Sequence, residues 1–345
     1  MMRTKEVVNM KQEIWIDNIK LFACFLVAMG HFFMSMVESG ILPDSNLHKW
    51  FVRTIYYFHV PLFFMCSGYL YQTKSYIRTV VSWKDNVIKK AVTLGVPYFL
   101  FSIVTWILKN VFSDSVNIQN EGLLFTLFLR PSSPYWYLYT LFFLFIATPT
   151  LAGRKHALMV LLTAILLKYV CAAKFFVIDV YAINQTLDNF VWFVCGMCMS
   201  VFRVPIICKD KKWKNAGLLC CGVFIAISFV DLTLFLDKVS NELIMGLLGC
   251  LTVFLVILNG NGVGNVTSAA SALSKYTMPV YLMHTIFAAG IRAVLMKLQI
   301  VNPVFHVIVG LSASFVGPVM TVWILEQLKL DFVIYPSKYW KWKSS

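Results

Sequence analysis

The sequence predicts an all-α fold, a polytopic membrane helical bundle of about ten transmembrane helices with both termini in the cytoplasm. Composition is the first reason, because 59% of the 345 residues are hydrophobic and 13% are charged, against about 45–50% and 25% in soluble domains. A soluble protein of this length cannot bury so much apolar surface. The net charge of +14 therefore has to be interpreted by its position relative to a membrane, and we expect no nucleic-acid partner.

Long apolar runs are the second reason. A hydrocarbon layer about 30 Å thick requires about 20 apolar residues in a helix, and continuous runs favour helices over the short alternating strands of a barrel. The first run carries charged residues and has no small-x-small cleavage site, so we expect a retained helix rather than a signal peptide. The predicted spans cover residues 14–37, 50–72, 87–109, 135–153, 155–172, 184–203, 214–236, 240–260, 273–297 and 301–328.

The distribution of lysine and arginine is the third reason. With the N-terminus inside, the cytoplasmic segments hold 20 of the 30 Lys and Arg residues, the opposite side holds nine, and Lys20 lies within the first span. Cytoplasmic loops of membrane proteins carry such an excess. The asymmetry therefore predicts that both termini are cytoplasmic and that the number of spans is even.

One transmembrane domain accounts for the chain, residues 1–345, with its core at about 14–328. The longest loop, residues 110–134, is predicted to face outside, and we expect no soluble domain. The glycine-rich segment at 259–264 follows a predicted helix in a short loop. We interpret it as a turn rather than as a phosphate-binding loop.

A stripe of polar side chains runs along the first predicted span. At 100° per residue, six positions fall within about 60° on one face of the helix. The six residues are Asp17, Lys20, Cys24, His31, Ser35 and Glu38. Ionisable groups inside membrane spans are functional candidates. The alternative is that Asp17 and Lys20 anchor the span at the interface and His31 donates to a neighbouring backbone.

The second and ninth predicted spans each carry a histidine. His59 precedes Pro61, which cannot donate an N–H and frees a carbonyl in the preceding turn. A core histidine that satisfies this backbone and a catalytic histidine are therefore equally compatible with the pattern. The pair Ser67-Gly68 lets another backbone approach closely, and in the ninth span Tyr281 and His284 share one polar face.

Neither cysteine nor histidine indicates a metal site or a disulfide. Most of the nine cysteines lie within apolar runs, where cysteine behaves as a small hydrophobic residue. Cys195 and Cys198 have CxxC spacing, but no second pair or nearby histidine accompanies them. Three histidines on three spans have no acidic or thiolate partner at ligand spacing, so we expect no metal.

Four segments together resemble a known family. The first is Asp17-Asn-Ile-Lys20 followed, after ten residues, by His31. The second-span FHVPLFFMCSGYL is similar to the signature F-x-x-P-x-F-F-x-x-SG-[FY], and PYWYLYTLFFLFIATP and SKYTMPVYLMH also fit. These segments resemble acyltransferase family 3, the integral membrane acyl-CoA-dependent O-acyltransferases, and the resemblance extends over residues 14–328.

The resemblance implies a function and a set of roles. It implies transfer of an acyl group, most simply acetyl, from cytoplasmic acetyl-CoA or another acyl-CoA to a hydroxyl of a cell-surface or lipid-linked glycan. The location it implies is the bacterial cytoplasmic (inner) membrane, with the lipid bilayer as the surrounding partner. The implied catalytic residues are His31, Lys20 and Asp17. Of these, His31 would act as general base or acyl carrier, and Asp17 would hold Lys20. The remaining implied site residues are Lys20, Lys89 and Lys90 for the CoA phosphates, Glu38 for the acceptor, and His59, Ser67, Tyr281 and His284 as site lining.

The chain departs from the family pattern before the third span. The family has R-x-x-R ahead of a proline, whereas here Lys90 stands for the first arginine, Thr93 replaces the second, and Pro97 follows. Lysine lacks the bidentate fork of arginine, so contacts to the CoA phosphates are expected to differ. The esterase-like extracytoplasmic domain of some members is also not found, so a separate extracytoplasmic partner is an alternative to a self-sufficient membrane domain.

Two functions from other classes compete with this interpretation. A secondary transporter or glycan exporter would also have ten spans with interruptions at Pro61 and Pro279. However, no two corresponding interrupted spans mark an inverted repeat, and polar groups concentrate in spans one, two and nine. A sensor or scaffold that kept the fold without activity is the third interpretation.

Overall fold

The computed structural model describes residues 14–113, 117, 121–172, 179–208, 212–234, 238–259 and 272–340, and within these ranges all regular structure is helical. The predicted turn at 260–264 lies outside the described residues. The long helices are α1 (Ile14–Glu38), α2 (Asn46–Tyr56), α3 (His59–Lys74), α4 (Val80–Val111), α5 (Trp136–Ala147), α6 (Arg154–Ala172), α7 (Tyr181–Val201), α9 (Lys212–Leu234), α10 (Lys238–Asn259), α12 (Thr277–Lys297) and α13 (Pro303–Gln327). The short elements are α8 (Val204–Ile207), the π-helix η2 (Phe125–Leu129) and the 3₁₀ helices η3 (Asp331–Val333) and η4 (Pro336–Lys338).

Every predicted span overlaps a helix, and the protein is an all-α, multi-pass membrane protein. Among the described residues, six segments are long and apolar enough to cross a bilayer on length and composition. They lie in α1, α4, α9, α10, α12 and α13. The count of ten spans and the cytoplasmic position of the termini stay predictions.

Two of the predicted spans are interrupted or shortened at a proline. The second is interrupted between α2 and α3, because Pro61 cannot donate to a carbonyl four residues earlier but fits the first turn of a new helix. The fourth ends at Ala147, six residues before its predicted end, since Pro149 disfavours a helical Thr148, whose backbone is extended. Proline therefore determines where α3 begins and where α5 ends.

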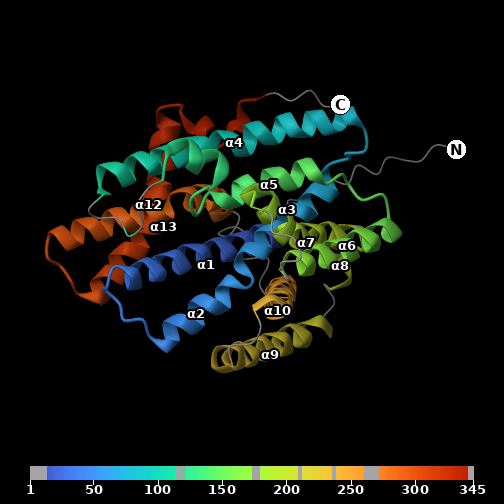
Figure 1. The fold of residues 1–345 in the computed structure, drawn as a ribbon, viewed down its shortest axis with the longest axis horizontal. Coiled ribbons are helices and arrows are strands. Elements are labelled where there is room, and N and C mark those ends of the chain that lie inside the picture. Colours follow the sequence, from blue (N-terminus) through green and yellow to red (C-terminus); the bar gives the residue numbers. More distant parts are fainter. Residues whose placement is uncertain are drawn as a thin grey trace.

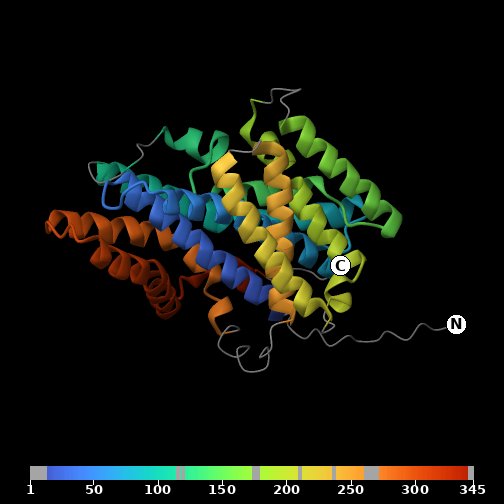
Figure 2. The same cartoon turned by 90° about the horizontal axis from the view of Figure 1, so that it is seen from below.

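Helix α1 lies at the centre of the bundle. It contacts α2, α3, α10, α12 and α13, and the two orthogonal views show it crossing the middle of the molecule beside the α12–α13 pair (Figures 1 and 2). The helix pairs α6–α7 and α9–α10 also pack together. A residue on α1 can therefore meet side chains from several other helices.

The closest helix crossing joins α3 to α7. A Cβ atom on Gly68 would lie 2.0 Å from the Phe193 carbonyl oxygen, and one on Gly196 would lie 1.9 Å from the Met65 carbonyl oxygen. Only glycine permits this approach, which confirms the close contact predicted for Ser67-Gly68. The neighbouring Cys198 directs its thiol to the Ala157 carbonyl at 3.5 Å, as expected for a packing role.

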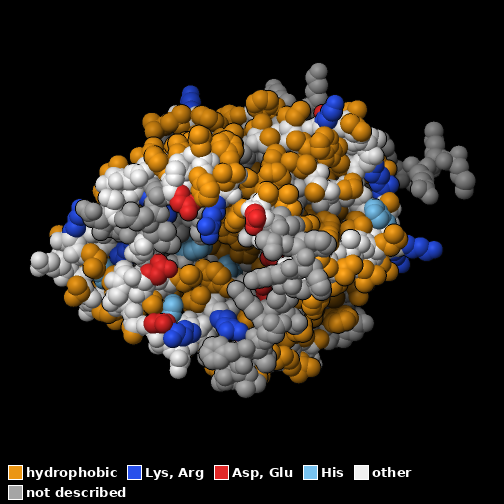
Figure 3. All heavy atoms as spheres, viewed as in Figure 1, with side chains coloured by type: hydrophobic (Ala, Val, Ile, Leu, Met, Phe, Trp, Pro, Cys, Tyr) orange, Lys and Arg blue, Asp and Glu red, His pale blue; other side chains and the backbone are white. Residues whose placement is uncertain are grey.

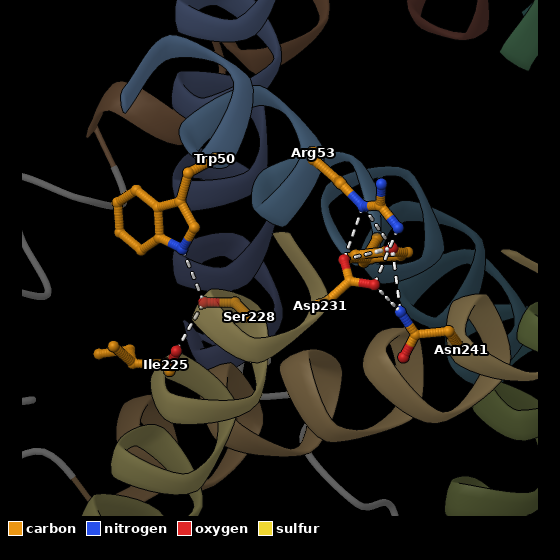
Figure 4. Close-up of polar contacts among 7 residues, drawn as sticks. Trp50, Arg53, Ile225, Ser228, Asp231 and Asn241 are labelled. Carbon is orange, nitrogen blue, oxygen red and sulfur yellow. Dashed lines mark hydrogen bonds and ion pairs between the residues drawn. The ribbon is translucent and has the colours of Figure 1, made fainter. Parts of the chain in front are cut away.

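A polar cluster ties α2 to α9 and α10 (Figure 4). Arg53 donates to both carboxylate oxygens of Asp231, from Nε at 2.6 Å and from Nη2 at 2.8 Å. The Tyr57 hydroxyl donates to Oδ2 of Asp231 at 2.8 Å, and the Asn241 amide donates to Oδ1. We call these four residues the Arg53–Asp231 network. It holds α2 against the bundle just before the interruption that leads to His59.

Candidate functional site

A small pocket lies where α1, α3, α12 and the start of α5 meet. Its volume is sufficient for a water molecule. On the face shown in Figure 3, histidine side chains are visible in a hollow between acidic and basic side chains. The pocket is lined by Val27, His31, His59, Val60, Phe63, Pro134, Trp136, Tyr137 and Tyr281.

The polar stripe of α1 faces the protein interior. Cys24 is buried, and His31 and Ser35 are half-buried. Phe22 and Phe25, on the opposite face of the helix, are both exposed. The middle of the stripe therefore lies on the inward face of α1, whereas Glu38 at its end is exposed.

His31 is the residue of this stripe that lines the pocket. Its ring centroid lies 5.4 Å from that of His284 and 6.3 Å from that of Tyr56. Nε2 of His31 is 3.5 Å from the Ser133 hydroxyl, which is a weak contact at most. His31 thus keeps its hydrogen-bonding capacity while it borders the pocket.

His59 serves the backbone at the helix interruption. Its Nδ1 lies 2.6 Å from the Ile55 carbonyl oxygen, which belongs to the last turn of α2. Because a carbonyl can only accept, Nδ1 carries the proton. The interpretation of His59 as a core histidine therefore accounts for its Nδ1. The His59 ring also lines the pocket.

His284 is held in the same way on α12. Its Nδ1 lies 2.9 Å from the Val280 carbonyl and 3.0 Å from the Tyr281 carbonyl. The ring is 1% exposed, and its Nε2 has no hydrogen-bond partner among the described residues. We call His31, His59 and His284 the histidine site.

Tyr281 and Ser67, two further predicted lining residues, are placed differently. Tyr281 lines the pocket, and its hydroxyl donates to the Pro134 carbonyl. Ser67 does not line it, but its hydroxyl lies 3.1 Å from that of Tyr137, which does. Ser67 therefore contacts a residue of the pocket wall without lining the pocket itself.

Further polar side chains lie beyond the histidine site, toward the C-terminal end of α1. Glu38 is exposed and accepts from the Asn117 amide at 3.1 Å. Arg292 on α12 is 6% exposed and donates to the Ser35 carbonyl at 3.1 Å and to its hydroxyl. Sequence reasoning missed Arg292, although a charge inside an apolar span, eight residues after His284, was an available signal.

The predicted cationic residues lie at the other end of α1. Lys90 is half-buried with its ammonium 3.7 Å from the ring centroid of Phe145, and it is subject to electrostatic repulsion from Lys89 and Lys20. The Thr93 hydroxyl donates to the Lys89 carbonyl at 2.9 Å. Thr93 therefore does not replace the missing arginine as a cation, and three lysines make up this end of the site.

The structure thus separates the predicted site residues into two groups, one toward each end of α1. Lys20 lies about 16 Å from His31 along α1 at 1.5 Å per residue. Asp17 lies about one turn before Lys20 on the same helix. No group of three His, Cys, Asp or Glu side chains in the described ranges has a metal-binding arrangement.

Comparison with known proteins identifies relatives by sequence. A family model described as an acyltransferase domain matches residues 13–323. The nodulation protein NolL of Mesorhizobium japonicum is 27% identical over 135 residues, which are 39% of this chain and 35% of that protein. The matched stretch therefore spans about a third of the relative's length. No solved structure matches.

Proposed function

The chain belongs to the acyltransferase family whose domain covers residues 13–323, and from this premise we propose that it transfers an acyl group from acyl-CoA to a glycan hydroxyl. The donor is most simply acetyl-CoA, and the acceptor is a cell-surface or lipid-linked glycan. The observation that carries the proposal is the arrangement along α1. Three lysines gather at one end, and a histidine borders a pocket about 16 Å further along the same helix.

The lysine end is suited to hold the donor. Lys20, Lys89 and Lys90 offer ammonium groups that make charge-assisted hydrogen bonds to the phosphates of CoA. The pantetheine arm is long and thin, so it would run along α1 and bring the thioester to the histidine site. Asp17 would hold Lys20 in place.

The histidine end supplies the chemistry. A neutral His31 takes the proton of the acceptor hydroxyl, whose oxygen attacks the thioester carbonyl carbon. The C–O bond forms, the C–S bond breaks, and the CoA thiolate receives the proton. Carriage of the acyl group by His31 itself is the second route, and it needs the same unprotonated nitrogen.

The acceptor would enter from the Glu38 end. Glu38, Asn117 and Arg292 place a carboxylate, an amide and a guanidinium within two turns of His31, and such groups hydrogen-bond sugar hydroxyls. We place the protein in the bacterial inner membrane, where cytoplasmic acyl-CoA and an external glycan meet on opposite sides. A separate extracytoplasmic partner is compatible with this arrangement.

The test uses purified protein in detergent with labelled acetyl-CoA, and it measures release of free CoA. Wild type should consume the donor, slowly by hydrolysis when no acceptor is present. His31→Ala should lower the rate about 100-fold or more, the range of general acid–base catalysis. The matched control is His306→Ala on α13, because Nε2 of His306 lies 2.6 Å from the Ile300 carbonyl and His306 does not line the pocket.

Three results would count against the proposal. Retained activity in His31→Ala would remove His31 from the chemistry. A wild-type protein that neither binds nor consumes any of several acyl-CoAs would favour a transporter or a scaffold. Loss of activity in His306→Ala with unchanged folding would also show that the effect is not specific to the pocket.

A further inference from the structure

We infer that His284 is the positioning residue for His31: its Nε2 accepts the N–H of His31 and shares the proton that His31 takes up during acyl transfer. This inference rests on the proposed function and names a residue that orients the base. From the sequence, no residue was expected to perform this task, and His284 was expected only to line the site.

The hydrogen bonds of His284 fix its tautomer. Nδ1 faces two carbonyl oxygens, those of Val280 and Tyr281, and carbonyls cannot donate. Nδ1 therefore carries the proton, and in the neutral ring Nε2 carries a lone pair. The two carbonyls also fix the plane of the ring, so Nε2 is a rigid acceptor.

This acceptor is buried and unpaired among the described residues. Buried polar atoms without a partner are rare in folded proteins, and each needs an explanation. Three donors on the surrounding elements are committed to backbone carbonyls. Cys24 donates to the Thr277 carbonyl, Tyr281 to Pro134, and Tyr135 to Leu282.

His31 is the imidazole ring next to His284. The two imidazole centres are 5.4 Å apart with a 40° angle between their planes, a separation that a small rotation or one water molecule bridges. A general base needs its second ring nitrogen held by an acceptor, so that the first nitrogen presents its lone pair to the substrate. In many enzymes a carboxylate does this, and here a neutral imidazole takes its place.

The proposed step balances in protons and bonds. The hydroxyl proton passes to His31 as the C–O bond forms, and the other N–H of His31 is shared with Nε2 of His284, so two rings carry the positive charge. When the C–S bond breaks, the thiolate takes a proton from His31. Both imidazoles then return to the neutral form.

Two substitutions separate this role from a purely structural one. His284→Asn keeps an amide donor for the Val280 and Tyr281 carbonyls but removes Nε2. His284→Gln places an amide oxygen about where Nε2 lies, which accepts a hydrogen bond but takes no proton. His306→Gln is the matched control, because it keeps an amide donor for the Ile300 carbonyl, which lies 2.6 Å from Nε2 of His306, and His306 does not line the pocket.

Steady-state kinetics with acetyl-CoA provides the first readout. We expect His284→Asn to lower kcat about 10–100-fold, as for other partners that orient a functional histidine, with KM for acetyl-CoA unchanged. His284→Gln should recover part of this loss, and His306→Gln should stay within about threefold of wild type. Wild-type kcat in His284→Asn, or a Gln variant no better than the Asn variant, would overturn the inference.

A second readout does not depend on turnover. The chain has six histidines, so ¹⁵N-histidine spectra of the labelled protein can be assigned by single substitutions. We expect the His31 nitrogen shifts to change in His284→Asn and to stay the same in His306→Gln. Unchanged His31 shifts would overturn the inference even if the protein proves to be an acyltransferase, whereas an inactive wild type with coupled histidines would overturn only the proposed function.

Discussion

The Arg53–Asp231 network and the histidine site are both polar clusters within an apolar helical bundle, but they differ in how completely their atoms are paired. Asp231 is 1% exposed, and both of its carboxylate oxygens accept hydrogen bonds from Arg53 and from a second donor. In the histidine site, His284 Nε2 is unpaired among the described residues, and His31 has only a contact of 3.5 Å. A fully satisfied network stabilises one structure, whereas unpaired groups beside a pocket are available to a substrate.

The two clusters are linked through α2. Tyr57 belongs to the network, and two residues earlier the Ile55 carbonyl accepts from His59. The network therefore supports the backbone that orients one member of the histidine site. We expect substitutions in the network to affect stability first, and substitutions in the histidine site to affect turnover first.

The largest effect on stability is expected for Asp231→Ala. The substitution leaves Arg53 and Asn241 without their acceptor, and removal of one partner from a buried ion pair costs about 3–5 kcal/mol. Arg53 is 31% exposed, so water replaces part of the lost interaction and we expect about 3 kcal/mol. The measurement is thermal unfolding in detergent, followed by size-exclusion chromatography.

The matched variant removes both charges. Arg53→Met with Asp231→Leu should recover most of the lost stability, because no buried charge stays unpaired. Activity per folded molecule should fall by less than in His31→Ala. Equal stability of wild type and Asp231→Ala would show that the network does not hold α2.

A smaller effect is expected at the lysine end of α1. Lys90→Met removes a charge that would hold a donor phosphate, so KM for acetyl-CoA should rise about tenfold, which corresponds to about 1.4 kcal/mol. The kcat should change little, because the histidine site is unaffected. Lys84→Met, at an exposed position of the same helix α4, is the control, and an equal rise in KM for both variants would indicate a general effect of surface charge.

The sequence predicts the helices and the inward face of α1 because both depend on local patterns. Apolar runs specify helices in a membrane protein, and the spacing of polar residues selects one face. The approach of His31 to His284 was also within reach, since each lies on the polar face of its own helix. Proline positions explain where α3 begins and α5 ends, although residues 50–72 were expected to form one helix.

Pairing between distant residues is not readable from a single sequence. Arg53 and Asp231 are separated by 178 positions, and Arg292 and Ser35 by 257. Their contacts depend on how helices pack, which no local periodicity specifies. That Nε2 of His284 is unpaired is even harder to predict, because its pairing depends on the direction of every neighbouring donor.

The smallest effect is expected at Asp331, which belongs to a polar cluster after α13, outside the membrane-spanning helices. Its carboxylate accepts from the Tyr339 hydroxyl and from the Lys338 ammonium at 3.2 Å. These hydrogen bonds, that of Tyr339 first, hold the pKa of Asp331 below its usual value. The folded state therefore binds this proton less tightly than the unfolded state does, and the cluster contributes stability at neutral pH.

The sign of the pH dependence follows from the lowered pKa. The contribution of Asp331 is complete above the unfolded pKa of about 4 and is lost as the pH falls through the lower folded value. Asp331→Asn should lower the unfolding midpoint by about 1–2 °C at pH 7, and the difference from wild type should disappear toward pH 3. Asp85→Asn, at an exposed position of α4, is the matched control and should follow wild type. If the difference stays constant from pH 7 to pH 3, the carboxylate of Asp331 stabilises this segment through its shape rather than its charge, and the cluster then resembles neither the network nor the histidine site.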